Sequence, residues 1–145
     1  MMPPDIAGLV PQSGPMCLLQ EITQSDALGI VCRAMSHRAA DNPLRCDGAL
    51  PAVAGIEYAA QALAAHCALL AGDAAGEPMR GLLAGVREVT LHVARLDDVE
   101  GPLTVRARRL VANGPRLLYG FAVQCGEREL LSGRVAVVLQ SGARA

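Results

Sequence analysis

One helix, apolar on almost every side, constrains the fold of this chain more than any other feature. The segment from Pro51 to His66 reads PAVAGIEYAAQALAAH, and this pattern predicts a helix over about residues 52–70. Such a helix must be enclosed by other elements, because every face would otherwise expose apolar surface to water. Glu57 is the exception near its start. A carboxylate placed there needs a partner or a chemical role, because burying an unpaired charge is costly.

Length and composition favour a single globular domain over residues 1–145, since 145 residues with 52% hydrophobic content are enough for a full core. The five cysteines are scattered and include no Cys-x-x-Cys pair, which argues against a disulfide framework and against a zinc site. We therefore expect a reducing, cytoplasmic location, with no metal and no cofactor.

The same composition argues against two classes of partner. A net charge of −1 and an aromatic content of 2% provide neither the basic excess nor the stacking surface that nucleic-acid binding uses. No apolar run reaches about 20 residues, so we expect no membrane-spanning segment. The first residues, Met1 to Asp5, also lack the basic and apolar regions of a signal peptide.

Alternating and apolar runs predict strands on both sides of the helix. We expect two before it and four after it, the latter joined by hairpins: 16–23, 28–36, 82–95, 103–112, 116–125 and 130–140. The last strand is apolar on both faces, which favours a central position. A lone helix beside an antiparallel sheet is an α+β arrangement. Because a flat sheet covers only one face of a helix, the pattern indicates a strongly curved sheet, a dimer partner, or both.

This order resembles the hotdog fold, in which an antiparallel sheet wraps one long central helix. The motif Gly55-Ile56-Glu57-Tyr58-x-Ala60-Gln61 is similar to the helix of the (3R)-hydroxyacyl-acyl-carrier-protein dehydratases (FabZ-like). Its pattern is closest to the ApeP-like branch found in aryl-polyene biosynthesis clusters. Two other segments, 9–19 and 82–87, resemble the N-terminal segment and the third strand of that family.

The resemblance implies a reaction and a site. In that family a helix Glu and a His from the preceding loop remove the α-proton of a β-hydroxyacyl thioester and help the hydroxyl leave as water. Carried over by motif, Glu57 takes the place of the catalytic Glu and Gln61 that of the neighbouring polar residue. Gly55 would offer its N–H to the thioester carbonyl, where the helix dipole favours an oxyanion. Pro51 and Gln12 complete the expected substrate-binding residues.

The chain departs from the family at the histidine. The position about fourteen residues before Glu57 holds Pro43, and Gln12 stands where the N-terminal segment of the family has a His. We expect His37 either to swing in as the acid/base partner of Glu57 or to be a solvated residue at the end of a strand. The other two histidines are expected to be structural or at an interface (His66) and solvent-facing (His92).

Three functions stay open at this stage. The chain is either a dehydratase of fatty-acid, polyketide or aryl-polyene type, or a non-catalytic subunit that pairs with an active dehydratase, or a thioesterase in which Glu57 acts without a His. The expected partners are an acyl-carrier-protein thioester or acyl-CoA, together with a second copy or a related subunit. Four arginines either form a basic rim for an acidic carrier protein or are ordinary solvated strand residues: Arg87, Arg106, Arg108 and Arg109.

Overall fold

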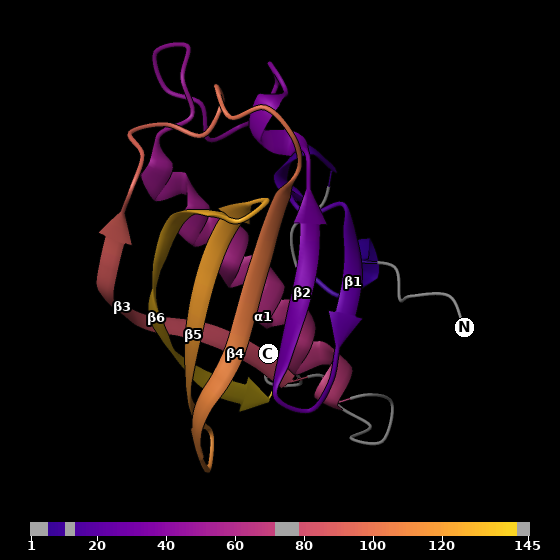
Figure 1. The fold of residues 1–145 in the computed structure, drawn as a ribbon. Helices are drawn as coiled ribbons and strands as arrows, with labels where there is room; N and C mark the ends of the chain where they lie inside the picture. Colours follow the sequence, from indigo (N-terminus) through magenta and orange to yellow (C-terminus); the bar gives the residue numbers. More distant parts are fainter. Residues whose placement is uncertain (1–5, 11–13, 72–78, 142–145) are drawn as a thin grey trace.

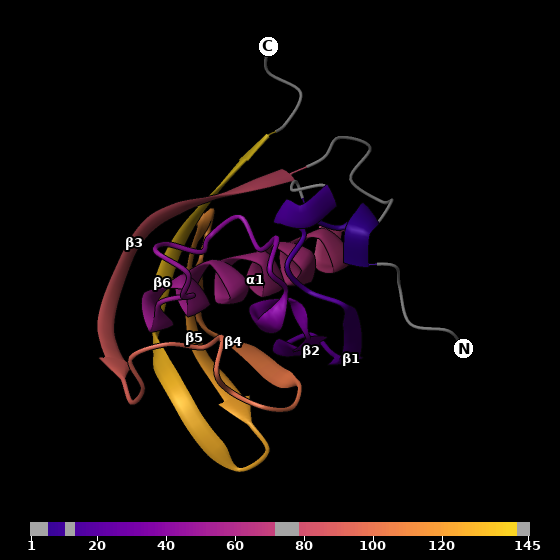
Figure 2. The same ribbon diagram turned by 90° about the horizontal axis from the view of Figure 1, so that it is seen from above.

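A six-stranded antiparallel sheet curls around one helix in the computed structural model, which describes residues 6–10, 14–71 and 79–141 (Figures 1 and 2). The strands lie in the order β1-β2-β4-β5-β6-β3. Their bounds are β1 Glu21–Ser25, β2 Gly29–Ala34, β3 Met79–Leu91, β4 Leu103–Asn113, β5 Arg116–Cys125 and β6 Arg128–Ser141. The predicted arrangement, a curved sheet wrapped around one central helix, is confirmed.

The central helix is α1, Gly55–Ala71, and a 3-10 turn, η4 (Ala52–Ala54), precedes it. By length and mean hydropathy alone, the stretch Ala52–Ala71 is apolar enough to cross a membrane, which the run-length prediction missed. In this fold half of that stretch is buried inside the protein, as the core helix enclosed by the sheet. Its hydropathy therefore follows from its place in the core.

The inner face of the sheet carries the core. Along β4 the buried residues Val105 and Ala107 alternate with exposed Arg106 and Arg108, as the strand period of two requires. The strand predicted over 103–112 is confirmed. The helix approaches the sheet closely at Gly55, where an added Cβ would lie 2.6 Å from a Leu131 methyl carbon on β6. Glycine is required there because any side chain would overlap Leu131.

Two predictions about strands were wrong. The strand expected over 16–23 is instead a 3-10 turn, η2 (Gly14–Met16), then an extended stretch, and the strand begins only at Glu21. The backbone of this stretch hydrogen-bonds to helix side chains at Met16 and Leu18, so local alternation did not reveal its partner.

The first of the hairpins expected after the helix is also absent from the described strands, because β3 does not pair with β4. Strand β3 pairs with β6, and the chain then crosses to β4 through residues 92–102. This crossing passes the start of the helix, where Ala52 N–H donates to Ala94 O (3.0 Å) and Leu96 N–H donates to Leu50 O (2.8 Å). The predicted interior position of the last strand is confirmed, since β6 lies between β5 and β3.

Candidate active site at the start of the central helix

Glu57 lies in the first turn of α1 with its side chain half-buried. One turn later, Gln61 is fully buried and donates from Nε2 to Glu57 Oε2 at 3.2 Å. Residues four apart share one helix face, which brings these two side chains together. The only acidic residue of this helix is thus held at its start, the end at which the helix dipole favours negative charge.

The amide of Gln61 is fixed by the segment that precedes β1. Its Nε2 also donates to Met16 O at 2.7 Å, and its Oε1 accepts from Leu18 N–H at 2.9 Å. Both amide hydrogens are therefore used within the protein, and the orientation of the amide is determined by its partners. Gln61 consequently holds the Glu57 carboxylate in place, which adds a positioning role to its predicted contact with substrate.

A second chain of hydrogen bonds lies beside Glu57. Ser36 Oγ donates to Leu18 O (2.8 Å) and therefore accepts from the Tyr58 hydroxyl (2.7 Å). Asn42 Nδ2 donates to Tyr58 Oη (3.1 Å) and to Ser36 O (2.9 Å). Burial raises the pKa of Tyr58, so the phenol stays protonated at neutral pH. This network ties the long irregular segment before the helix to the first turn of the helix.

His37 is buried in the 3-10 turn η3, Ser36–Arg38, so the expectation of a solvated strand end was wrong. Its Nε2 lies 3.0 Å from Val99 O. A carbonyl only accepts, so Nε2 carries the proton and Nδ1 presents a lone pair. That Nδ1 is buried without a hydrogen-bond partner. Burial lowers the pKa of His37. The imidazole is thus neutral at pH 7, with an unused acceptor, and shares no hydrogen bond with Glu57.

The remaining predicted substrate-binding residues lie around the helix start, with one exception. Gly55 N–H already donates to Ala52 O within the 3-10 turn, so any oxyanion would compete with that bond. Pro51 is extended, precedes the turn and forms an isolated bridge with Arg95. Gln12 lies outside the described residues. Among those that are described, no group of three or more His, Cys, Asp or Glu is placed to hold a metal ion.

The other two histidines lie away from Glu57, as predicted. His66 is buried in the second half of the helix, with Nε2 2.8 Å from Asp26 O and Nδ1 2.6 Å from the Tyr119 hydroxyl. The structural role expected of it is confirmed. His92 is exposed and pairs with Glu129 at 3.0 Å, so the prediction of a solvent-facing residue is also confirmed.

Sequence reasoning missed the residues that support the helix start. Ser36 and Asn42 were not singled out. Asp97 was also missed: its Oδ1 accepts from Leu50 N–H at 2.9 Å, and Arg95 pairs with the same carboxylate. The Arg95 hydrogen bond and the Leu50 N–H keep the pKa of Asp97 well below its usual range. These contacts join residues far apart in sequence, so no local pattern marks them.

A curled antiparallel sheet around one central helix, with a carboxylate in the first helical turn, defines a hotdog-fold protein. A chain of the dehydratase heterocomplex ApeI:P from Xenorhabdus doucetiae has a TM-score of 0.82 at 20% identity, covering 98% of this chain and 93% of that one. A hypothetical thioesterase with coenzyme A from Streptococcus pneumoniae has a TM-score of 0.61 at 14% identity, covering 83% and 85%. A mutant thioesterase from Pseudomonas aeruginosa has a TM-score of 0.60 at 13% identity, covering 83% and 81%.

Within that class, the chain belongs to the ApeP-like family, described as ApeP dehydratase, whose model matches residues 4–144. The predicted resemblance is confirmed. A search of the curated proteins found no match. The structural neighbours, at 20% identity or less, establish the fold alone.

Proposed function

We propose that this protein dehydrates 3-hydroxyacyl thioesters carried by an acyl carrier protein, with Glu57 as the acid/base residue. The observation that carries the proposal is the half-buried Glu57 carboxylate, held in the first turn of an apolar helix by the fully bonded Gln61 amide. Membership of the ApeP-like dehydratase family supports the same reaction. Fatty-acid, polyketide or aryl-polyene biosynthesis is the setting that we propose for it.

In the proposed reaction, Glu57 takes the proton from C2 of the 3-hydroxyacyl thioester. The electron pair of that C–H bond forms the C2–C3 double bond, and the C3–O bond breaks. The departing hydroxyl takes up a proton and leaves as water, so the products are an enoyl thioester and water. Glu57 can return the same proton to the hydroxyl, which leaves the carboxylate ready for another turnover. His37 Nδ1 is the second basic atom that we propose for proton transfer, because its lone pair is unused.

The test uses the purified protein and a 3-hydroxyacyl-pantetheine thioester, with enoyl product and free thiol followed separately. We expect Glu57→Gln to lower the rate of enoyl formation by about 10²–10⁴-fold, the usual contribution of a general acid or base. Glu129→Gln is the control, because it removes an exposed carboxylate that pairs with His92. Wild-type enoyl formation that survives Glu57→Gln unchanged would remove Glu57 from the mechanism.

His37→Gln tests the second base. The Gln amide can keep a donor for Val99 O while it removes the imidazole lone pair. A lower rate at an unchanged melting temperature supports proton transfer by His37. An unchanged rate gives His37 a structural role, and Glu57 then acts alone.

One observation favours a different function. The Nε2 atom of His37 is held by Val99 O at 3.0 Å, so this nitrogen is not available for a Glu–His acid/base pair. A non-catalytic subunit that binds the thioester beside an active dehydratase meets this geometry equally well. It predicts that the protein forms neither enoyl product nor free thiol and yet binds the thioester. Free thiol without enoyl product would instead identify a thioesterase in which Glu57 activates water.

We also propose that the protein works in the cytoplasm as an oligomer. None of the five cysteines forms a disulfide, which supports a reducing compartment. Val53 beside the helix start and Leu91 at the end of edge strand β3 are 52% and 46% exposed, and a second copy or an active dehydratase would cover them. Sedimentation velocity should give the mass of at least two chains, alone or with that dehydratase. A monomer in both samples contradicts the proposal.

A further inference from the structure

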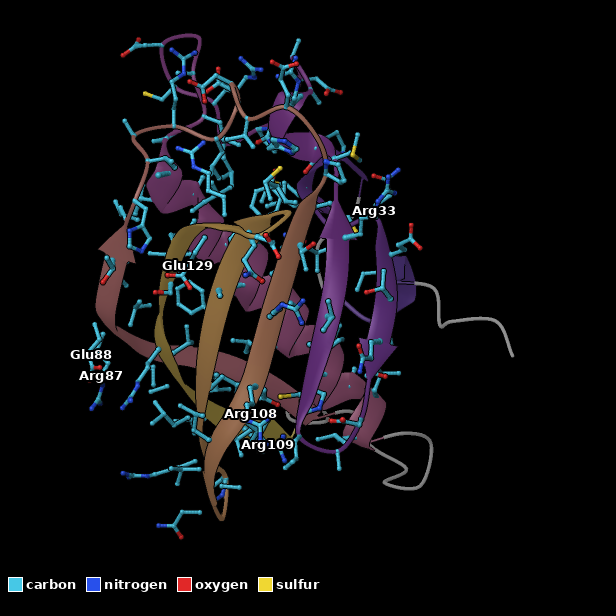
Figure 3. All side chains as sticks on the ribbon, viewed as in Figure 1. Arg33, Arg87, Glu88, Arg108, Arg109 and Glu129 are labelled. Atoms are coloured by element: carbon cyan, nitrogen blue, oxygen red, sulfur yellow. The ribbon has the colours of Figure 1, made fainter. Side chains whose placement is uncertain are left out.

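The outer face of the sheet, remote from the helix, carries arginines in one row across the strands. The strand registers pair Arg108 on β4 with Gly120 on β5, Gly120 with Arg134 on β6, and Arg134 with Arg87 on β3. Figure 3 shows Arg87 at the β3 edge of this face and Arg108 near its middle, at a similar level. We call Arg87, Arg134, Arg108 and the neighbouring Arg106 the arginine row.

The arginine row borders a hollow of about 580 Å³ on the same face. Gly120 and Ser132 are among the small residues that line it, and Arg106, Arg108 and Arg134 stand around it. Two carboxylates also reach it. Asp26 accepts from the Leu28 and Gly29 backbone N–H groups in the β1–β2 turn, and Glu88 lies 3.7 Å from Arg134. Three arginines and two carboxylates thus line the hollow, a local positive excess in a chain whose net charge is −1.

The arginine row lowers the stability of the isolated protein. Arg87 and Arg134 are directly opposite each other on paired strands, and like charges in that relation destabilise a sheet. Glu88 offsets part of this, but it does so from a backbone φ of +56° in a β-bulge, a conformation that non-glycine residues seldom adopt. Among the described residues, no carboxylate lies within ion-pair distance of the Arg87 or Arg108 guanidinium. Two of the four arginines thus have positive charge to offer a partner.

The spacing of the row indicates what that partner is. Neighbouring strands lie about 4.8 Å apart, so the three strand steps from Arg108 to Arg87 span about 14 Å. That is too wide for one phosphate group to meet all of them. It matches the acidic face of a helix, on which carboxylates three and four residues apart lie about 5–6 Å from each other. A second copy of this chain is a poor occupant, because a two-fold contact through this face would bring the same arginines together.

We propose that the arginine row docks an acidic helix of a partner protein, which under the proposed function is the acyl carrier protein that delivers the thioester. The position suits delivery, because Arg87 is on edge strand β3, on the side of the molecule where α1 begins (Figure 1). Four residues further along β3, Leu91 pairs with Leu131, which contacts Gly55 at the helix start. At about 3.3 Å per residue, the two points are about 13 Å apart along the strand.

The predicted basic rim is thereby revised. Arg109 does not belong to it, because its guanidinium lies against the inner-face residue Tyr119 and donates to the Tyr119 hydroxyl at 3.1 Å. Arg134, which the sequence did not single out, takes its place. Arg106 is held by Gln124, to which its Nε donates at 2.7 Å, so its position is defined before any partner binds.

The test measures binding of an acyl carrier protein, carrying a fluorescent pantetheine group, by anisotropy at low and at physiological ionic strength. We expect Arg108→Ser/Arg134→Ser to weaken binding about tenfold or more and to reduce its salt dependence. Both arginines attract the acidic carrier protein before it docks. The control is Arg33→Ser/Arg116→Ser, which removes two arginines outside the row: Arg33 is half-buried and pairs with Glu21, and Arg116 is exposed. Turnover of the small pantetheine thioester should be the same in both variants as in the wild type.

Four results would overturn the docking proposal. The row variant could bind the carrier protein as tightly as the wild type, or the control variant could lose as much affinity as the row variant. The row variant could also dissociate an oligomer, or a DNA duplex could bind with the same dependence on the row. The proposed function fails separately, if the protein turns over neither the small pantetheine thioester nor the thioester on the carrier protein. In that case row-dependent binding of the carrier protein still supports the docking surface.

Discussion

The central helix carries two polar clusters, and they differ in what they leave available. The first-turn cluster joins Glu57, Gln61 and Tyr58 to two segments that precede the helix. The second-half cluster joins His66 to Tyr119 and Arg109 on the sheet, with a T-shaped contact between the two rings. Both interrupt an apolar helix, so each has a cost that some role must justify.

Within the second-half cluster the donors and acceptors form a closed sequence. His66 Nε2 faces the carbonyl of Asp26 and so carries the proton, which leaves Nδ1 to accept from the Tyr119 hydroxyl. Arg109 donates to the same phenol oxygen, although its Nε is buried without a partner. Both ring nitrogens of His66 are used inside the protein. The first-turn cluster instead includes the half-buried Glu57 carboxylate, whereas His66 is fully buried. A polar group on an apolar helix is therefore a better functional candidate when a substrate can reach it.

The largest expected effect comes from breaking the second-half cluster. His66→Phe would leave Asp26 O and the Tyr119 hydroxyl without their partner, and each unsatisfied buried group costs about 1–3 kcal/mol. We expect a loss of roughly 3 kcal/mol in the free energy of unfolding, measured by urea denaturation. Turnover per folded molecule should not change. A variant as stable as the wild type would show that this cluster contributes nothing to the fold.

Gly55→Ala should have the next largest effect on stability. It tests the first turn of the helix, as His66→Phe tests the second half. The new methyl group would meet Leu131, and overpacking of this kind costs about 1–3 kcal/mol. Leu131→Ala alone opens a cavity in the core and destabilises as well. In the double variant the two defects compensate, so the sum of the single effects should exceed the measured one. Strict additivity of the changes in unfolding free energy would mean that the methyl group added at Gly55 and the Leu131 side chain do not clash.

The smallest expected effect is on pH dependence. Burial lowers the pKa of His66 from its ordinary value of 6.5, and that of His37 likewise. The unfolded chain therefore binds these protons first, and stability that is complete above about pH 6.5 is lost as the pH falls toward the folded values. Each histidine adds at most about one proton to the slope of stability against pH.

His66→Gln keeps a donor and an acceptor but cannot titrate, so its stability should fall less steeply below pH 6.5 than that of the wild type. The matched control is His92→Gln, which makes the same substitution at an exposed histidine outside the second-half cluster. Denaturation curves collected between pH 5 and pH 8 provide the comparison. Parallel slopes for the wild type and His66→Gln would contradict the assignment of His66 as a buried neutral histidine.

Much of the fold could be predicted because its signals are local. The helix and the long strands have periodic patterns, and the i, i+4 spacing alone pairs Glu57 with Gln61. The partner of β3 could not be predicted, since nothing between residues 79 and 102 distinguishes a hairpin from a crossing past the helix. The stretch from Met16 to Gln20 was mistaken for a strand because an extended segment bonded to the Gln61 side chain has the same alternation as a strand bonded to a sheet.

The candidate site was predictable only in part for the same reason. Glu57 stood out as the one charge on an apolar helix, whereas the burial of His37 depends on a carbonyl at Val99, 62 residues further along the chain. Ser36 and Asn42 contact Tyr58 across separations of 22 and 16 residues. Side chains that meet only after the chain has folded leave no spacing in the sequence to recognise.

The pairing of β3 with β6 has a consequence for synthesis on the ribosome. Leu18 and Leu19 are core residues, but Gln61, which holds Leu18, is made 43 residues later. Strand β3 stays without its neighbour until residues 128–141 have emerged, because β6 is its only partner among the described strands. The nascent chain therefore displays much of its apolar interior until the last strand is added. A chaperone that covers these surfaces would be needed most just before residues 128–141 emerge.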